Sequence, residues 1–342
     1  MRGGVLVSEY RTIAEVFVIP APDAKGRVSR GITRFKKVLG LGADSSRSLV
    51  APHFRSYDGV LGNTIVTLPE LGFFKRKSMP TVCWIHELAY VANSFFPNGR
   101  FPKVAANADR FIAPSKAVED FLRQCGISST TNLVYEFSQP NNRAGVPAVS
   151  VNRSDFGIPA GAFLVVGRGT IEWRKGVDIF LQVATAVVRS CPDVYFIWEG
   201  GSVVGTEAEF DKIRFDLERL SLDGRVIFAG YVPDLSSVLR EADLFALTSR
   251  EDPFPLVCLD AAALGKPIIC FAGAGGMPEF VEDDAGTVVP YGDIVAFRDA
   301  IIRYHRDRPA LERAGRTAKM KVDKKFSMDA SCEAIARILL EL

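Results

Sequence analysis

Residues 249–279 read SREDPFPLVCLDAAALGKPIICFAGAGGMPE, and this stretch says most about the fold. Two carboxylates, Asp252 and Asp260, stand eight positions apart around a Pro-Phe-Pro turn. A run of small residues typical of a helix follows, then an apolar strand at Ile268–Phe271 and a glycine-rich loop. An acidic turn and a glycine turn that each open a helix can hold a sugar by its hydroxyls and a phosphate by backbone N–H groups.

The length and composition limit the class of protein. A chain of 342 residues predicts two domains, and 48% apolar with 24% charged residues is typical of globular proteins. A net charge of +2 argues against a nucleic-acid binder. Six scattered cysteines without a C-x-x-C pair indicate buried thiols in a reducing compartment. No apolar run is long enough to span a bilayer and no secretory signal opens the chain, which predicts a cytoplasmic protein, at most peripheral to the inner membrane face.

Strand-like and helix-like runs alternate in the first half of the chain. A helix is expected at Ala117–Gln124, with Ser115 as its N-cap. The expected strands are Val16–Ile19, Val60–Leu61, Thr81–Ile85 and Phe111–Ala113. This alternation predicts a parallel sheet covered by helices.

A polar stretch at 139–147 is the best linker, so we expect an N-terminal domain at 1–146 and a second domain at 147–325. The alternation then restarts, and 326–342 holds a final helix that we expect to pack back toward the first domain. Strands are expected at Phe163–Val166, Val194–Trp198, Val226–Ala229, Leu244–Leu247 and Ile268–Phe271, and helices at Gly176–Val188, Glu207–Leu220 and Met328–Leu342. Two parallel-sheet domains in series imply a cleft, with ligands at the carboxyl ends of the strands.

The two carboxylates fit the start of a helix. Pro255 suits the first helical position, which places Asp252 just before the helix and Asp260 in its second turn. The positive end of that helix favours an anion nearby. An isolated pair of this kind is more often a cap and a solvated side chain, and the flanking motifs reverse that preference.

Four further groups stand where strands end. The loop from Arg168 to Gly176 carries three cations, which suits a diphosphate leaving group on which negative charge builds. The turn 273–279 carries three glycines that let backbone N–H groups approach a phosphate. His86 follows an apolar strand and is well placed to point into a cleft. Tyr231, in another strand-end turn, is a candidate wall for a base and ribose.

Together these residues resemble the family-4 retaining glycosyltransferases of the GT-B fold, over most of the chain and most strongly from Gly167 to Asp293. The E-x7-E motif of the family is similar to Asp252-x7-Asp260, with Asp in place of both Glu. Its Arg/Lys-Gly loop is similar to Arg168 through Gly176, and its G-G-x-P-E turn to 275–279. Its strand-end histidine is similar to His86.

The resemblance implies two Rossmann-like domains facing across a cleft and a metal-independent enzyme without a cofactor. The enzyme would move a hexose from a UDP- or GDP-sugar to a glycan or lipid-linked acceptor, with retention, in cell-surface polysaccharide biosynthesis. His86, Lys175 and Asp252 would be catalytic. Donor-binding residues would be Arg168, Lys175, Tyr231, Phe254, Pro255, Leu256, Asp260, Gly275, Gly276, Met277 and Glu279. Lys175 and Arg168 would neutralise the diphosphate, Asp260 would hold the ribose, and the glycine turn would add N–H groups.

Two departures from the family pattern leave alternatives open. Aspartate shortens both carboxylate arms by one methylene, and the chain is expected to lack the first strand, glycine loop and helix of the family. A non-catalytic or impaired nucleotide-sugar-binding protein and a nucleotide-sugar epimerase of the same fold are therefore alternatives. A dehydrogenase is disfavoured because no G-x-G-x-x-G opens the first strand–helix unit. The basic stretch 27–37 is either a contact for anionic lipid or, more commonly, a solvated helix.

Overall fold

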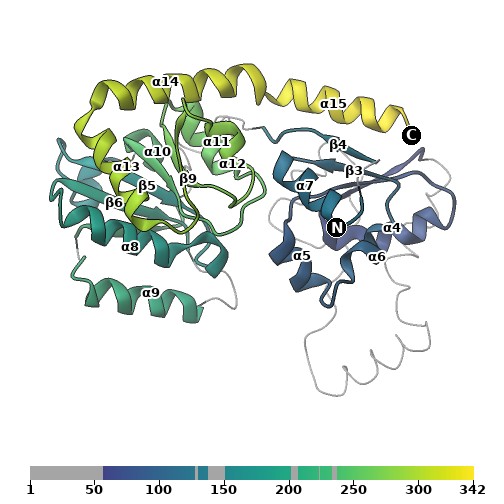
Figure 1. Ribbon diagram of the computed structural model, residues 1–342, viewed down its shortest axis with the longest axis horizontal. Coiled ribbons are helices and arrows are strands. Elements are labelled where there is room, and N and C mark those ends of the chain that lie inside the picture. The colour runs from purple at the N-terminus through teal and green to yellow at the C-terminus, as the bar shows by residue number, and fades with distance from the viewer. Residues whose placement is uncertain (1–56, 128–129, 138–150, 202–206, 223, 233–236) are drawn as a thin grey trace. The chain divides into compact units, whose positions relative to one another are not determined.

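A computed structural model describes residues 57–127, 130–137, 151–201, 207–222, 224–232 and 237–342 (Figure 1). The strand expected at Val16–Ile19, the basic stretch 27–37, the start of the first domain and the linker at 139–147 lie outside the described residues. Residues 59–342 form one compact unit that contains two sheets.

The first sheet has four parallel strands in the order β1-β2-β3-β4. These are β1 (Val60–Asn63), β2 (Thr81–Trp84), β3 (Arg110–Ala113) and β4 (Thr131–Leu133). The connections carry α4 (Leu68–Lys75), α5 (Ala89–Phe95), α6 (Phe101–Ala105) and α7 (Lys116–Gln124). Ser115 caps α7 as predicted, since its hydroxyl accepts a hydrogen bond from the Val118 N–H. The βα alternation read from the sequence is confirmed here, while β4 was not predicted.

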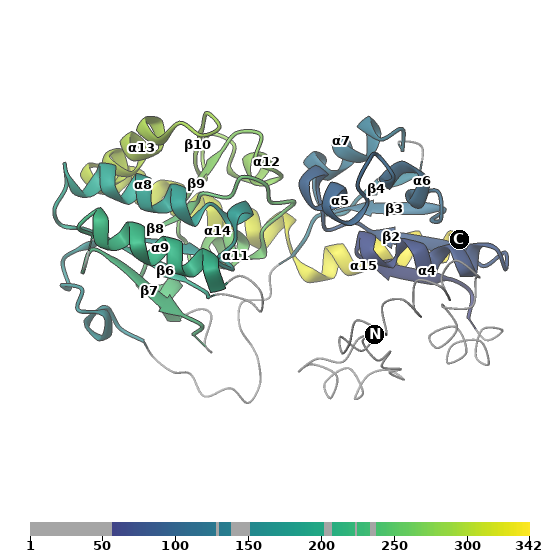
Figure 2. The same cartoon turned by 90° about the horizontal axis from the view of Figure 1, so that it is seen from below.

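Both faces of the first sheet are covered, because its side chains alternate. Along β2, Cys83 packs into a cluster with α4, α6 and α7, whereas Val82 points to the other face. There Val82 meets Ile112, Val134 and Ile338. Ile338 belongs to α15 (Met328–Leu340), so the last helix of the chain completes the core of the first sheet (Figure 2).

The second sheet has six parallel strands in the order β10-β9-β8-β5-β6-β7. They are β5 (Phe163–Arg168), β6 (Val194–Glu199), β7 (Val226–Gly230), β8 (Leu244–Leu247), β9 (Ile268–Phe271) and β10 (Gly286–Val289). Five of them confirm predicted strands to within two residues at each end. The sixth, β10, was not predicted, and it pairs with β9 at the edge of the sheet.

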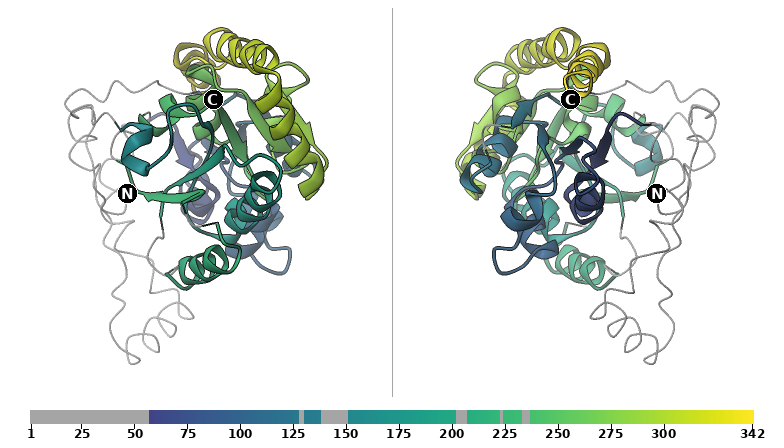
Figure 3. Two further views of the ribbon diagram at one scale, coloured as in Figure 1. Left: turned by 90° about the vertical axis from the view of Figure 1, so that its left-hand side faces the viewer. Right: turned by 90° about the vertical axis from the view of Figure 1, so that its right-hand side faces the viewer.

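The helices of the second sheet lie on both of its faces. Phe163 and Val165 of β5 belong to one cluster, with α8 and α13, and Leu164 and Val166 belong to the other, with α10 and α11. Figure 3 shows α13 and α14 side by side at the outside of this sheet. The helices are α8 (Val177–Val188), α9 (Glu207–Arg219), α10 (Ser237–Glu241), α11 (Leu256–Ala263), α12 (Met277–Val281), α13 (Ile294–Arg306) and α14 (Arg308–Lys325), with short 3-10 turns at Arg153–Phe156 and Trp173–Lys175; a further 3-10 turn, Ile65–Thr67, belongs to the first sheet. Burial on both faces explains the continuous apolar strands of the sequence.

The cysteines are free thiols, and four of them are buried as predicted. Cys125 is half-buried, however, and Cys332 on α15 is exposed. No helix in the described part of the chain combines the length and apolarity that a membrane crossing needs. The predicted fold class, α/β with two parallel sheets, is confirmed, while the cleft between two domains stays a prediction.

Candidate active site

The cationic loop after β5 meets the acidic turn after β8. The Lys175 ammonium lies 2.6 Å from Oδ2 of Asp252, and Arg174 Nη1 lies 3.6 Å from Oδ1 of the same carboxylate. The Ser249 hydroxyl donates to Oδ2 at 3.1 Å. Asp252 is 7% exposed, so its negative charge is neutralised by close partners. The structure therefore brings together Lys175 and Asp252, two of the three residues predicted to be catalytic.

The neighbouring Arg174, not among the predicted site residues, ties the two loops together. Its guanidinium donates to the backbone carbonyl of Glu251 at 3.0 Å and to Glu172 Oε1 at 2.9 Å. An ammonium has three N–H donors, and the Lys175 ammonium uses one of them for its hydrogen bond to Asp252. Lys175 thus keeps donor capacity for an anion while Asp252 holds it in place.

Arg168, at the end of β5, pairs with a different carboxylate. Its side chain forms an ion pair with Glu199, the residue opposite it at the end of β6, and both are buried. The loop cation that was expected to neutralise a diphosphate is therefore matched by a carboxylate within the fold. Glu199 directly follows the strand predicted at Val194–Trp198, but nothing in the sequence indicates that it is a partner for Arg168.

The glycine turn packs against the acidic turn by its backbone. Asp252 N–H donates to the Ala274 carbonyl at 2.7 Å, and Gly275 forms a parallel bridge with Asp252. Gly275 has φ +135°, and a Cβ there would lie 1.7 Å from the Asp252 carbonyl oxygen. The Gly276 N–H donates to the Pro253 carbonyl at 3.0 Å, so it is used within the turn. Glycine at 275 is thus required by a close approach of two backbones.

Replacing Gly275 by alanine is expected to lower the free energy of unfolding by about 3 kcal/mol or more, because the Asp252 carbonyl has to move. Gly273→Ala is the matched control in the same turn. Its φ is +70°, and nothing lies within 4 Å of the added Cβ. That variant is expected to cost about 1–2 kcal/mol for its left-handed backbone alone. Urea unfolding measures both, and equal costs would contradict the close approach.

Helix α11 begins one residue later than predicted. Pro255 is its N-cap, with ψ 115°, and Leu256 is the first helical residue. The extended ψ angle is incompatible with the first helical position that we assigned to Pro255, which corrects that prediction. Asp260 lies in the second turn, as expected, and is half-buried.

The apolar residues predicted to line the donor differ in exposure. The Phe254 side chain is buried and stacks on Phe326, at 5.5 Å between ring centroids, so it belongs to the core. Met277, the first residue of α12, is 1% exposed. Leu256 and Tyr231 are exposed. Phe254 and Met277 can therefore offer a ligand their backbone and not their side chains.

His86 lies just beyond β2, at the carboxyl end of the first sheet. Its Nε2 is 2.5 Å from Oδ1 of Asn63, and its Nδ1 is 2.7 Å from Oε1 of Glu136. Asn63 ends β1, and Glu136 follows β4. The strand-end position of His86 agrees with the sequence-based expectation, whereas Glu136 was not anticipated. It follows β4, a strand that was not predicted, so its position at a strand end was not apparent from the sequence.

Glu279, predicted to contact the donor, holds the first turn of α7. Its carboxylate accepts hydrogen bonds from the Lys116 N–H at 2.9 Å and from the Tyr135 hydroxyl at 3.1 Å. Burial raises the pKa of the Glu279 carboxyl, and the hydrogen bonds from Tyr135 and Lys116 oppose this shift. Burial, together with the adjacent Glu279 charge, also raises the pKa of Tyr135. Glu279 is thus a capping carboxylate at a helix N-terminus, a role that sequence spacing did not reveal.

A second carboxylate repeats this arrangement. Both oxygens of Glu251 accept from the Tyr90 N–H in the first turn of α5, at 3.2 and 3.0 Å. The Ser115 hydroxyl also donates to the Pro253 carbonyl at 2.8 Å. Loops at the carboxyl ends of β8 and β9 therefore contact the starts of α5 and α7 from the first sheet.

The raised pKa of Glu279 predicts a pH effect on stability. The carboxyl binds its proton more tightly in the folded than in the unfolded chain, so its contribution is most favourable below the ordinary pKa of 4.5 and is lost as pH rises through the folded value. Glu279→Gln removes this titration, and its amide oxygen still accepts from Lys116. We expect the variant to gain stability relative to wild type as pH rises from about 4 to 7, measured by urea unfolding. A difference that stays constant over this range would contradict the burial of the charge.

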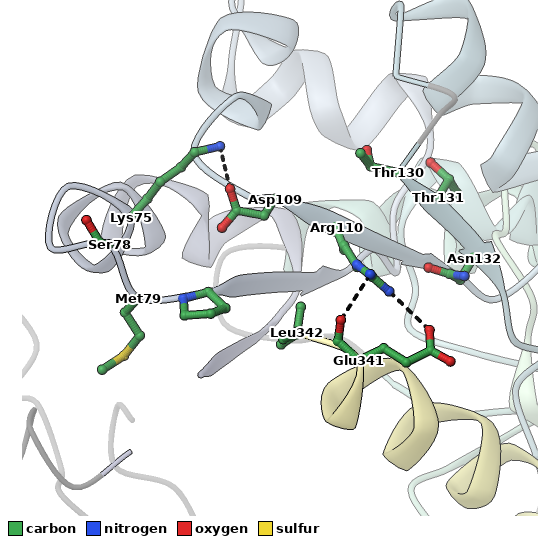
Figure 4. Close-up of a pocket in the computed structure, with 11 residues that line it drawn as sticks. Lys75, Ser78, Met79, Asp109, Arg110, Thr130, Thr131, Asn132, Glu341 and Leu342 are labelled. Carbon is green, nitrogen blue, oxygen red and sulfur yellow. Dashed lines mark hydrogen bonds and ion pairs between the residues drawn. The ribbon is translucent and has the colours of Figure 1, made fainter. Parts of the chain in front are cut away.

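A pocket of about 720 Å³ lies at the opposite, amino-terminal edge of the first sheet (Figure 4). Its walls include the ion pairs Lys75–Asp109 and Arg110–Glu341. None of the residues predicted to bind the donor lines it. The pocket is therefore separate from the candidate active site.

Among the described residues, no group of three or more His, Cys, Asp or Glu side chains is placed to hold a metal ion.

Comparisons with known proteins agree with this architecture. Residues 160–307 match the family model of glycosyl transferases group 1. The chain is 29% identical over 252 residues to D-inositol 3-phosphate glycosyltransferase of Saccharomonospora viridis, covering 67% of this chain and 57% of that protein. It is 28% identical over 224 residues to the lipopolysaccharide core biosynthesis glycosyltransferase LpsD of Rhizobium meliloti, covering 65% and 60%. The chain thus spans less than two thirds of the length of these curated relatives.

Solved structures extend the likeness over both sheets. Anabaena Alr3699/HepE in complex with UDP-glucose superposes with a TM-score of 0.74 at 25% identity, covering 86% of this chain and 82% of that one. Sucrose-phosphate synthase from Thermosynechococcus elongatus superposes with a TM-score of 0.74 at 22% identity, over 90% and 79%, which concerns the fold alone. Residues 160–307 are therefore similar to the group 1 glycosyl transferases, and the chain has the GT-B fold, with two parallel Rossmann-like sheets.

Proposed function

We propose that this chain transfers a hexose, with retention, from a nucleotide-diphosphate sugar to a glycan or lipid-linked acceptor. The observation that carries the proposal is the cluster of Lys175, Arg174 and Asp252 beside the glycine turn. It lies at the carboxyl ends of β5 and β8, where open parallel sheets bind ligands. Uracil is the favoured base of the donor, because HepE was solved with UDP and with UDP-glucose.

The donor diphosphate would bind next to Lys175, within reach of the N-terminal end of α11. Lys175 would donate to the phosphate oxygens while Asp252 holds its ammonium. Arg174, at the far side of Asp252, adds positive potential. Because negative charge grows on the leaving diphosphate, these donors stabilise the transition state more than the ground state.

The other predicted donor contacts remain part of the proposal. Asp260, in the second turn of α11, would accept from the ribose hydroxyls, and the backbone of Phe254–Leu256 and of the glycine turn would line the phosphates. Exposed Tyr231 would border the base. His86 would approach the sugar from the first sheet. The acceptor hydroxyl would attack from the face that the diphosphate leaves, and a leaving phosphate oxygen would take its proton.

The acceptor class comes from the relatives. LpsD is named for lipopolysaccharide core biosynthesis, so we propose a hydroxyl on a glycan or lipid-linked acceptor in the making of cell-surface polysaccharide. The Saccharomonospora protein is named for D-inositol 3-phosphate, which shows that relatives also use smaller acceptors. A cytoplasmic location, with contact to the inner membrane face, belongs to the same proposal. Arg168 enters it as a contact of lower rank, since Glu199 already matches its charge.

Calorimetric titration with UDP, UDP-glucose and GDP-mannose tests donor binding, and UDP release measures transfer or hydrolysis. We expect UDP and UDP-glucose to bind and UDP-glucose to be turned over. Binding without UDP release would favour the non-catalytic alternative, for which Asp252 in place of a longer glutamate is the motivating feature. A sugar product with one inverted centre, seen by NMR, would favour the epimerase. No binding of any nucleotide would reject the proposal.

A further inference from the structure

The ring of His86 is held between two polar side chains that arrive from different strands. Asn63, the last residue of β1, meets Nε2 at 2.5 Å, and Glu136, just after β4, meets Nδ1 at 2.7 Å. The His86 side chain is 30% exposed and that of Glu136 is 12% exposed. The contact with Glu136 is therefore shielded from water, while the ring keeps access to solvent and ligands.

The chemistry of the two partners decides which nitrogen carries a fixed proton. An ionised carboxylate only accepts hydrogen bonds, so Glu136 requires a hydrogen on Nδ1. The amide of Asn63 fits either state of Nε2, because its oxygen accepts from N–H and its NH2 group donates to a lone pair. Nε2 can therefore exchange Asn63 for a ligand hydroxyl while Nδ1 stays bonded to Glu136.

The backbone and ring plane of His86 are supported separately. The His86 N–H donates to Oε2 of Glu87 at 3.0 Å, and the same oxygen accepts from the Ile65 N–H at 3.1 Å. The ring lies against Trp84, at 4.8 Å between centroids. These contacts fix where the residue sits, and Glu136 sets the rotation of the ring and its tautomer.

We propose that Glu136 is a positioning residue for His86, fixing the Nδ1–H form and turning Nε2 toward the donor sugar. This inference rests on the proposed function, because it takes His86 to be a donor contact. Glu136 itself does not touch the donor. Its contribution is that the sugar hydroxyl meets one defined nitrogen, with no reorientation of the ring during reaction.

The test combines side-chain NMR with kinetics on the full chain. The chain has three histidines, so the ring ¹⁵N signals of His86 are assigned by comparison with His86→Ala. We expect a hydrogen-bonded Nδ1–H in wild type and loss of that signal in Glu136→Ala. In UDP-glucose turnover, Glu136→Ala is expected to lower kcat roughly 10- to 100-fold, the size of effect seen when a partner that orients a histidine is removed from metal sites. The donor KM should stay within about twofold, because no direct contact is lost.

Two variants separate positioning from a general loss of packing. Glu136→Gln keeps an acceptor oxygen for Nδ1–H and should restore most of kcat, which also keeps the test valid if the alanine variant folds poorly. Asp193→Ala removes the carboxylate 2.8 Å from Nε2 of His305, on the other sheet, and should leave kcat unchanged. An unaltered Nδ1–H signal in Glu136→Ala, or a wild-type kcat despite an altered tautomer, would overturn the proposal.

Failure of the proposed function would give a different pattern. If wild type neither binds nor turns over UDP-sugars while the His86 signal still depends on Glu136, the proposed function is wrong and the His86–Glu136 hydrogen bond is only a structural feature. If wild type is active but His86→Ala is too, the assignment of His86 to the donor site is wrong. Either result overturns a catalytic purpose for Glu136.

Discussion

Lys175→Ala is expected to weaken UDP binding roughly 10- to 100-fold, because a hydrogen bond to a charged group contributes about 1.5–3 kcal/mol. Turnover of UDP-glucose should fall further, by about 100- to 1000-fold, since the lost donor faces the charge that grows on the leaving diphosphate. The fold should survive, because Arg174 and Ser249 still contact the Asp252 carboxylate. Calorimetry and UDP release measure the two effects.

The control is Lys212→Ala. Lys212 is an exposed lysine on α9 that pairs with Glu209 one turn away, so its removal lowers the net charge equally without touching the site. Its UDP affinity should match wild type. If Lys175→Ala binds UDP as tightly as Lys212→Ala does, in a folded protein, the diphosphate does not lie against Lys175 and the proposed donor site is wrong.

Arg168→Met is expected to lower the free energy of unfolding by about 3–5 kcal/mol, because it leaves the Glu199 carboxylate buried without its cation. Glu199 is 1% exposed and Arg168 7%, so water cannot compensate for either charge. Replacing both, as Arg168→Met with Glu199→Leu, should recover most of the loss, because a buried ion pair and an apolar pair of similar volume differ little. Urea unfolding gives the free energies of the single and double variants.

The same double variant decides what Arg168 does for the donor. If it binds UDP like wild type, Arg168 serves the fold, whereas a loss of affinity in the stable double variant would restore it to the donor site. The surface pair Arg214–Asp211 on α9 is the control for ion pairs in general. Removing that pair should change stability by less than about 1 kcal/mol. A similarly small cost for Arg168→Met would show that the β5–β6 pair is not buried in solution.

Much of the fold followed from local pattern. Strands such as Ile268–Phe271 are buried on both faces and bounded by turns, so their apolar runs stood out in the sequence. β4 escaped notice because its three residues are half-buried and include Asn132. β10 begins with Gly286, which has φ +156° and whose absent Cβ leaves room for the Ile268 carbonyl. That glycine is a feature of strand packing, yet in sequence it resembles a turn.

The residues of the candidate site also fall into two groups, those that the sequence revealed and those that it did not. Lys175, Asp252 and the glycine turn were recognisable because each residue type stands at the end of a strand. The partners of the other predicted residues were not recognisable. The order of the strands and contacts between distant loops bring together the pairs Arg168–Glu199, His86–Glu136 and Glu279–Lys116. Pairings across 31 to 163 positions leave no periodic trace in a single sequence.

The contact of α15 with β2, β3 and the residue that follows β4 bears on how the polypeptide folds during synthesis. Elements near the N-terminus emerge first, and protein domains generally begin to fold as they emerge. One face of the first sheet, with Val82 and Ile112, is covered by Ile338 only after α15 has been synthesised. Nascent chains stalled before Met328 should therefore expose an apolar surface and recruit chaperones, whereas chains in which α15 has emerged from the ribosome should not.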